Sequence, residues 1–403
     1  MAKANGQSMS AARRQAFEKL KIPVTSRAIL SLDGGGIRGI LTIQLLKKLE
    51  ETAQMPCYEL FDMVAGTSTG AIIASLIVTG HAAADIEEMY EELVTKVFAR
   101  KFFRARFLNP PAFTKNNYRS ILKNLIGDIS LEEACAIHDL DLMITASDIS
   151  AGEETFFSCF KQEDGTYHGT YKDVLLRAAM EATMSAPTYF YPMERFLDGG
   201  TTTYNNPSLA AFIEATSYSA DKDKSSAYSV SAISLFSFGT GMSRQFKNFK
   251  QTIKPKGLAI TFWLHWIMNQ TGQDASMMQM NTFRSPVFKK IVDLRRFEIS
   301  LDPVALKKLE NTGTLNEKKY KTAWLHDLSS NVLDNIDLAD IRKFDLMKTI
   351  GEQMAKYIIS CGNNFESDLI NDHENDALVS FFGDVDCIKK QMSSAHWIDK
   401  SLA

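Results

Sequence analysis

The chain has almost no excess of charge of either sign. Among its 403 residues, 45 Lys and Arg stand against 48 Asp and Glu, which gives a formal net charge of −3. Proteins that hold a phosphate backbone need a basic surface, so this balance argues against nucleic acid as the main partner. The apolar share of 45% is that of an ordinary globular protein and excludes a disordered or collagen-like chain.

Cysteine is scarce, and its five copies are odd in number, far apart and without C-x-x-C spacing. This pattern argues against a disulfide framework and against a zinc site, and it makes a reducing compartment the expected location. We expect no metal and no bound cofactor. The cysteines are Cys57, Cys135, Cys159, Cys361 and Cys387.

Long apolar runs are also missing. The most apolar stretch, residues 71–84, is shorter than the roughly 18 residues that a spanning helix needs and contains Gly80 and His81. Residues 1–14 have a few basic side chains with no apolar run behind them, which is typical of a polar tail and not of a signal peptide. The sequence predicts a cytoplasmic protein that does not cross a membrane but could bind its surface.

What the sequence does contain is an alternation of short apolar runs with helical patterns. Continuously apolar runs are typical of buried parallel strands, and their alternation with helices predicts an α/β fold with a mostly parallel sheet. The expected strands are residues 28–32, 61–65, 142–146 and 233–238, and the expected helices include residues 41–49, 71–79 and 171–183.

The last third differs in composition. After Gly241, segments rich in Lys and amide residues separate helical patterns, the clearest of which covers residues 341–358. We expect a polar tail at residues 1–25, a catalytic domain at 26–245, and a mainly helical region at 246–403 that packs on that domain.

Residues 66–70, of sequence GTSTG, match the G-x-S-x-G nucleophile elbow and lie between an expected buried strand and a buried helix. Gly66 and Gly70 permit the sharp turn that leaves Ser68 above the sheet edge. The helix that begins at Thr69 directs its N–H groups and its positive end at a developing oxyanion. The alternative is an ordinary glycine turn in which Ser68 caps the helix.

Residues 33–39, of sequence DGGGIRG, also lie between a strand and a helix. They fit the G-x-G-x-x-G pattern of dinucleotide-binding folds, but the serine elbow occupies the strand end where that motif places an acidic residue. The other use of these N–H groups is to donate to an anionic oxygen, either an oxyanion or a phosphate, with Arg38 adding positive charge.

Asp198 is followed by Gly199 and Gly200. A general base needs a fixed carboxylate that another backbone segment can approach closely, and the two glycines permit such an approach. An ordinary Asp-Gly turn has the same sequence.

These three segments, in this order and separation, resemble the motifs of the patatin-like phospholipase family. The similarity covers residues 26–245 and implies a three-layer fold in which helices flank a mostly parallel sheet. Further segments that resemble the family are residues 184–190 (MSAPTYF), 205–207 (NNP) and 237–241 (SFGTG).

By this resemblance, Ser68 is the nucleophile and Asp198 its base. Such a dyad requires that burial raise the pKa of the aspartate toward the working range. A Ser-acid-His triad is the alternative, because four histidines follow Asp198: His265, His326, His373 and His396. The resemblance assigns the oxyanion hole to Gly34, Gly35, Gly36, Arg38, Gly39 and the N–H of Thr69.

Two segments suit contact with lipid. Residues 93–127 contain no acidic residue and interleave basic side chains with phenylalanines, and residues 261–268 are rich in aromatic side chains. A solvated helix face and ordinary core packing, respectively, are the alternatives. The candidate lipid contacts are Arg100, Lys101, Arg104, Phe262, Trp263 and Trp266.

Together these features predict a peripheral serine hydrolase that cleaves acyl esters of phospholipids or lysophospholipids through an acyl-Ser68 intermediate. Two alternatives remain: a nucleotide-binding protein that uses residues 34–39, and a catalytically silent lipid-binding protein. The sequence gives no indication of the oligomeric state.

Overall fold

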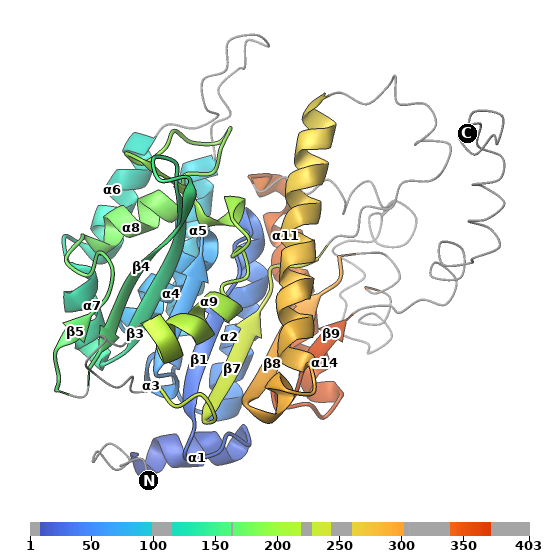
Figure 1. Ribbon diagram of the computed structural model, residues 1–403. Coiled ribbons are helices and arrows are strands. Elements are labelled where there is room, and N and C mark those ends of the chain that lie inside the picture. Colours follow the sequence, from blue (N-terminus) through green and yellow to red (C-terminus); the bar gives the residue numbers. More distant parts are fainter. Residues whose placement is uncertain are drawn as a thin grey trace, which may run out of the picture.

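A computed structural model describes residues 9–98, 115–162, 164–218, 228–242, 260–301, 306 and 339–371. Its centre is a twisted sheet in the order β5-β4-β3-β2-β1-β7-β8-β9, with β6 paired to β3 (Figure 1). The strands are β1 (Arg27–Leu32), β2 (Met63–Thr67), β3 (Asp141–Asp148), β4 (Glu153–Lys161), β5 (Tyr167–His168), β6 (Phe196–Asp198), β7 (Ile233–Phe238), β8 (Val292–Ile299) and β9 (Leu369–Asn371).

The pairings from β3 through β2, β1, β7 and β8 to β9 are all parallel, whereas β4, β5 and β6 are joined to the sheet by antiparallel pairings. The α-helices are α1 (Ala11–Lys19), α2 (Gly39–Ala53), α3 (Cys57–Leu60), α4 (Thr69–Val78), α5 (Ala83–Phe98), α6 (Lys115–Ile126), α7 (Leu131–His138), α8 (Leu176–Thr183), α9 (Ser208–Ile213), α11 (Ile260–Arg284) and α14 (Phe344–Ser360). Shorter turns are η1 (Gly36–Arg38), η2 (Gly199–Thr201), η3 (Glu214–Tyr218), η5 (Phe288–Lys290) and η6 (Ile341–Lys343).

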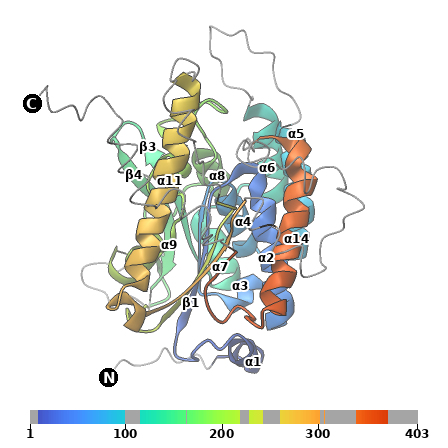
Figure 2. The ribbon, with the colours of Figure 1, turned by 90° about the vertical axis from the view of Figure 1, so that its right-hand side faces the viewer.

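Helices cover both faces of the sheet. Figure 2 shows α9 and α11 on one side of the strands and α2, α5 and α14 on the other. Side chains alternate accordingly along β1, where Leu30 belongs to the larger hydrophobic core under α2 and α4 and Ile29 to the smaller core under α9 and α11. The predicted α/β class with a mostly parallel sheet between helical layers is confirmed.

The four predicted strands correspond to β1, β2, β3 and β7, with boundaries shifted by a few residues. The described part of the last third is mainly helical, as predicted, and α14 packs against α2. It also supplies β8 and β9, which the sequence did not indicate, so the sheet continues past residue 245.

The N-terminal segment contains a helix where the sequence predicted only a polar tail. In α1, Ser10 accepts a hydrogen bond from the Arg13 N–H, and Phe17 is fully buried. Arg13 also forms an ion pair of 2.7 Å with Asp62. The tail prediction missed this helix because only a few of its side chains are apolar.

Candidate active site

The glycine-containing segments singled out in the sequence meet at one edge of the sheet. Asp33 and Ser68 directly follow the parallel strands β1 and β2, and on β6 Asp198 pairs with Ala146 near the carboxyl end of β3. In open α/β sheets, ligands bind at the carboxyl edge, beside the strand where the order reverses. Here that strand is β1, because β2 and β3 follow one another on one side of it and β7 and β8 on the other.

Ser68 lies in a strained turn between β2 and α4. Its backbone has φ 53° and ψ −121°, a conformation that non-glycine residues rarely adopt. Gly66 and Gly70 are needed on either side, because a Cβ at Gly66 would lie 2.6 Å from the Ala71 backbone and one at Gly70 would lie 2.7 Å from the Asp33 carbonyl oxygen. The predicted elbow is therefore present as a tight strand–turn–helix unit.

Ser68 and Asp198 are in direct contact. The Ser68 hydroxyl donates a hydrogen bond of 2.7 Å to Asp198 Oδ2, and the two residues are only 8% and 5% exposed. The Gly200 N–H donates to Asp198 Oδ1 at 2.7 Å. Burial raises the pKa of Asp198 to about 6, although the hydrogen bonds from Gly200 and Ser68 partly oppose this shift. Such a carboxylate can accept a serine proton near neutral pH.

The glycines beside Asp198 admit close neighbours. A Cβ at Gly199 would lie 2.6 Å from the Thr145 carbonyl oxygen, and one at Gly200 would lie 3.1 Å from Asp198 Oδ1. The Thr145 backbone therefore lies against Gly199, and the Asp198 carboxylate itself lies against Gly200.

One segment that contacts both members of the pair was assigned no role from the sequence. Thr183 Oγ1 accepts a hydrogen bond of 2.8 Å from the Ser68 N–H, and Met184 Sδ lies 3.5 Å from Ser68 Oγ. The Ser185 carbonyl accepts from the Asp198 N–H at 3.2 Å. The sequence indicates the MSAPTYF segment only by its resemblance to the family, because nothing in its spacing predicts these contacts.

The predicted oxyanion residues divide into two groups. The Gly34 N–H donates to the Asn205 carbonyl at 3.1 Å and the Gly35 N–H to Thr69 Oγ1 at 3.2 Å, so both hold the loop in place. Within the part of the chain that the structure describes, the N–H groups of Gly36 and Thr69 have no protein acceptor. These two remain available to a substrate oxygen.

Arg38 and Gly39 support the loop from behind. The Arg38 guanidinium donates to the carbonyls of Gly35 and Gly241, at 3.3 and 3.2 Å, and so braces the backbone. A Cβ at Gly39 would lie 3.0 Å from the ring of Tyr90, whose hydroxyl donates to the Gly36 carbonyl. The charge of Arg38, which the sequence suggested for the oxyanion itself, is thus engaged with loop carbonyls.

Two observations bear on the alternatives to a dyad and to an oxyanion loop. Because Ser68 donates directly to Asp198, the carboxylate occupies the position that a histidine takes in a triad. The side chains of His265, His326, His373 and His396 lie outside the described residues. A phosphate cradle would need N–H groups that Gly34 and Gly35 already use.

The candidate lipid contacts fall outside the part of the chain whose side chains the structure describes. Arg100, Lys101 and Arg104 lie outside the described residues, and the side chains of Phe262, Trp263 and Trp266, which belong to α11, are not described either. No described helix is both long enough and apolar enough to cross a bilayer.

Over the described ranges, no group of three or more His, Cys, Asp or Glu side chains is arranged to hold an ion. The four described cysteines are free thiols.

Comparison with known proteins agrees with the motifs. A family model described as patatin-like phospholipase matches residues 30–212. A protein of Escherichia coli (strain TW11681) named cGAMP-activated phospholipase is 31% identical over 204 residues, which cover 46% of this chain and 55% of that protein. The mouse 85/88 kDa calcium-independent phospholipase A2 is 31% identical over 254 residues, covering 59% of this chain and 30% of the mouse protein.

A plant relative, patatin-like protein 2 of Oryza sativa subsp. indica, is 28% identical over 255 residues, covering 55% of this chain and 60% of its own length. The chain thus spans less than two thirds of each of these three relatives. The family model and the relatives confirm the resemblance that the sequence motifs indicated. Residues 30–212 belong to the patatin-like phospholipase family.

Proposed function

We propose that this protein is a lipid acyl hydrolase that cleaves a carboxylic ester of phospholipids or lysophospholipids through Ser68 and Asp198. The observation that carries the proposal is the 2.7 Å hydrogen bond from the Ser68 hydroxyl, held in a strained elbow, to a buried carboxylate. The family and its phospholipase relatives support the class of substrate.

In the proposed reaction, Asp198 accepts the hydroxyl proton while Ser68 Oγ attacks the ester carbonyl. The N–H groups of Gly36 and Thr69 donate to the oxyanion that forms. Collapse of this intermediate breaks the bond to the leaving alcohol, which takes the proton from Asp198 and leaves an acyl-Ser68 ester. Water then attacks this ester as Asp198 takes one of its protons, and fatty acid release returns that proton to Ser68.

The place of action follows from the substrate. Because phospholipids reside in bilayers, we propose that the protein binds a membrane surface peripherally from the cytoplasm. The basic segment around Arg100 and the aromatic segment around Trp263 are the proposed contacts.

The proposal is tested with a fluorophosphonate probe, which reacts covalently with an activated serine, and with hydrolysis of phospholipid vesicles. Assays are run with and without cGAMP, since one relative is named for activation by it. We expect labelling of the wild type and its loss in Ser68→Ala, with hydrolysis falling at least 10³-fold and the fold intact.

Ser75→Ala is the matched control. Ser75 lies in α4, seven residues beyond Ser68, and is fully buried, so its variant should keep both labelling and hydrolysis. If folded Ser68→Ala hydrolysed the ester as fast as the wild type, Ser68 would not be the nucleophile. A wild type that neither reacts with the probe nor hydrolyses ester under either condition would favour the silent lipid-binding or nucleotide-binding alternatives.

A further inference from the structure

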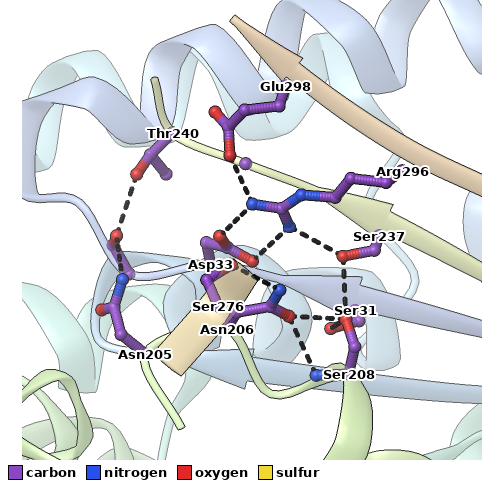
Figure 3. Close-up of polar contacts among 12 residues, drawn as sticks. Ser31, Asp33, Asn205, Asn206, Ser208, Ser237, Thr240, Ser276, Arg296 and Glu298 are labelled. Carbon is purple, nitrogen blue, oxygen red and sulfur yellow. Dashed lines mark hydrogen bonds and ion pairs between the residues drawn. The ribbon is translucent and has the colours of Figure 1, made fainter. Parts of the chain in front are cut away.

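A buried arginine lies directly behind the glycine loop. Arg296 of β8 is 3% exposed, and its guanidinium donates to both oxygens of Asp33, with distances of 2.8 Å to Oδ1 and 2.6 Å to Oδ2 (Figure 3). Asp33 directly precedes Gly34, the first glycine of the loop. Two parallel hydrogen bonds fix the orientation of the Asp33 carboxylate as well as its distance from the guanidinium. The pair therefore holds the start of the loop in one orientation.

A second carboxylate completes a cluster with balanced charge. Glu298, also on β8, accepts from Arg296 and from the Gly241 N–H, the latter at 2.9 Å. The Gly241 carbonyl in turn accepts from Arg38. Two arginines thus oppose two buried carboxylates. Loss of the Arg296 guanidinium would leave two buried carboxylates opposite the single positive charge of Arg38, which is strongly unfavourable.

The same loop is also held at a backbone carbonyl. The Gly34 carbonyl accepts from Thr240 Oγ1 at 2.9 Å and from Asn205 Nδ2 at 3.3 Å. Figure 3 shows these two side chains approaching the carbonyl from different segments, with the Arg296 cluster beside them. With its carboxylate and its carbonyl both fixed, the loop has little freedom to redirect its N–H groups.

Beyond Arg296 the polar contacts continue through the interior. Arg296 donates to Ser237 Oγ at 2.7 Å, and Ser208 donates to the same oxygen at 2.8 Å. Ser208 also contacts Asn206, which donates to Ser276 of α11 at 2.9 Å (Figure 3). Arg296 and Ser276 both lie after residue 212, where the match to the family model ends.

We propose that Arg296 is a positioning residue for the oxyanion loop, acting through Asp33 to hold the Gly36 N–H in the direction that the transition state requires. This inference rests on the proposed function. It assigns to the last third of the chain a direct part in the geometry of the active site. Misplacement of a reacting or donating group by about 1 Å can lower a rate about 10²-fold.

The test compares Arg296→Lys with Arg295→Lys. Lysine keeps the charge at either position but cannot form the planar fork. Arg295 is the next residue of the same strand and is 2% exposed, but it donates to the carbonyls of Lys21 and Phe365, at 3.0 and 2.9 Å, away from the glycine loop. The two variants therefore make the same substitution at buried positions of the same strand. They differ in the partners of the arginine, which belong to the glycine loop only for Arg296.

Steady-state hydrolysis of a soluble short-chain ester and the affinity of an alkyl trifluoromethyl ketone, which adds to Ser68 to form a tetrahedral oxyanion, are the measurements. For Arg296→Lys we expect kcat to fall about 10- to 100-fold with KM nearly unchanged, and ketone affinity to fall by a similar factor. For Arg295→Lys we expect both values within about threefold of wild type, even if its melting temperature falls. Asp33→Asn should give a similar loss, and the double variant should lose no more than either single one.

If Arg296→Lys does not fold, Ser237→Ala replaces it, because this change removes only one acceptor of the guanidinium. A several-fold fall in kcat with unchanged KM supports the inference. The inference is wrong if the folded Arg296 or Ser237 variant matches wild type, or if Arg295→Lys loses kcat and ketone affinity equally. An inactive wild type would instead count against the proposed function itself.

Discussion

At the scale of single residues, Asp198 combines a negative charge with near-complete burial. Among the described residues, two hydrogen bonds, from Gly200 and Ser68, compensate the lost hydration of the carboxylate, and its pKa rises to about 6. The same burial that makes this group a useful base near neutral pH therefore penalises its charged form in the folded protein.

The pH dependence of hydrolysis should reflect this group. Because Asp198 must be ionised to accept the Ser68 proton, we expect kcat/KM on a soluble ester to rise with pH and to level off above about 7, with a midpoint near 6. The measurement covers pH 4.5 to 8. Alanine at each of the seven histidines should leave the profile in place. A histidine variant as inactive as Ser68→Ala would establish a triad.

Asp198→Asn should abolish activity and yet stabilise the fold. The folded-state pKa of about 6 lies above the ordinary value of 3.8, so ionisation of Asp198 lowers the free energy of unfolding as pH rises from about 4 to 6, and this loss persists above that range. Asparagine carries no such charge. We expect the variant to be more stable than wild type by on the order of 2–3 kcal/mol at pH 8 and by nothing at pH 4.

Urea unfolding of both proteins at the two pH values measures this difference. A variant less stable than wild type at pH 8 would show that the hydrogen bonds of the carboxylate outweigh the burial of its charge.

At the scale of elements, the glycine loop before α2 contains a residue with a backbone conformation that other residue types cannot readily adopt. Gly36 has φ 57°, a left-handed conformation in which a Cβ is unfavourable, and its N–H is one of the two predicted oxyanion donors that have no acceptor among the described residues. We expect Gly36→Ala to lower kcat by roughly 10²- to 10³-fold with a much smaller change in KM. Ester kinetics on the purified variant measure both constants.

Gly152→Ala is the control for backbone strain. Gly152 has φ 74° in the turn between β3 and β4, and a Cβ there would have no neighbour within 4 Å. Its variant should lose stability but not turnover. If Gly36→Ala instead kept its turnover and changed its affinity for a nucleotide, the loop would be a phosphate cradle.

The strands differ in how well the sequence could predict them. β1 and β2 are continuous apolar runs followed by glycine motifs, so both the strands and the site residues after them could be found from the pattern alone. β8 reads VDLRRFEI, in which charged residues interrupt the apolar ones. Each of its two arginines pairs with a carboxylate of the same strand, but both also depend on distant partners, which are Asp33 for Arg296 and backbone carbonyls for Arg295. A local pattern holds no record of those distant partners.

The same reasoning applies to the site. Ser68 and Asp198 carry local signals, namely the glycines on either side of the serine and after the aspartate. Thr183 and Arg296 carry none, because their roles depend on where α8 and β8 lie relative to the elbow and the glycine loop. The sequence could therefore indicate the groups that we propose to react, but not the residues that hold them in place.

At the scale of the whole molecule, the proposed function requires a buried serine to reach an ester that resides in a bilayer. The chain has little net charge, so attraction to anionic lipid has to come from a local basic segment. Five basic residues fall between residues 96 and 106: Lys96, Arg100, Lys101, Arg104 and Arg106.

Replacing Arg100, Lys101 and Arg104 with glutamine should weaken binding to anionic vesicles, since each charge near such a surface contributes about 1 kcal/mol. Vesicle sedimentation and vesicle hydrolysis should both fall, salt should weaken the wild type likewise, and activity on a soluble ester should stay unchanged. Unchanged sedimentation would show that these charges are merely solvated and would direct attention to Phe262, Trp263 and Trp266.

The expected division at residue 245 remains a prediction, and the sheet is continuous across it. β7 precedes this position, β8 follows it, and the two strands pair in parallel along six residues of each. A polypeptide that ended there would expose the edge of β7 and the face of α2 that α14 covers.

The ion pair between Asp33 and Arg296 has a consequence for the inheritance of this gene. The two residues are 263 positions apart in the chain, so a recombination event that exchanges the last third between relatives separates them. A hybrid then carries Asp33 from one parent and whatever residue the other parent supplies opposite it. Fusions that preserve an arginine at this point of β8 should survive selection for activity, while those that lose it should be removed, even though every residue of the serine elbow is intact.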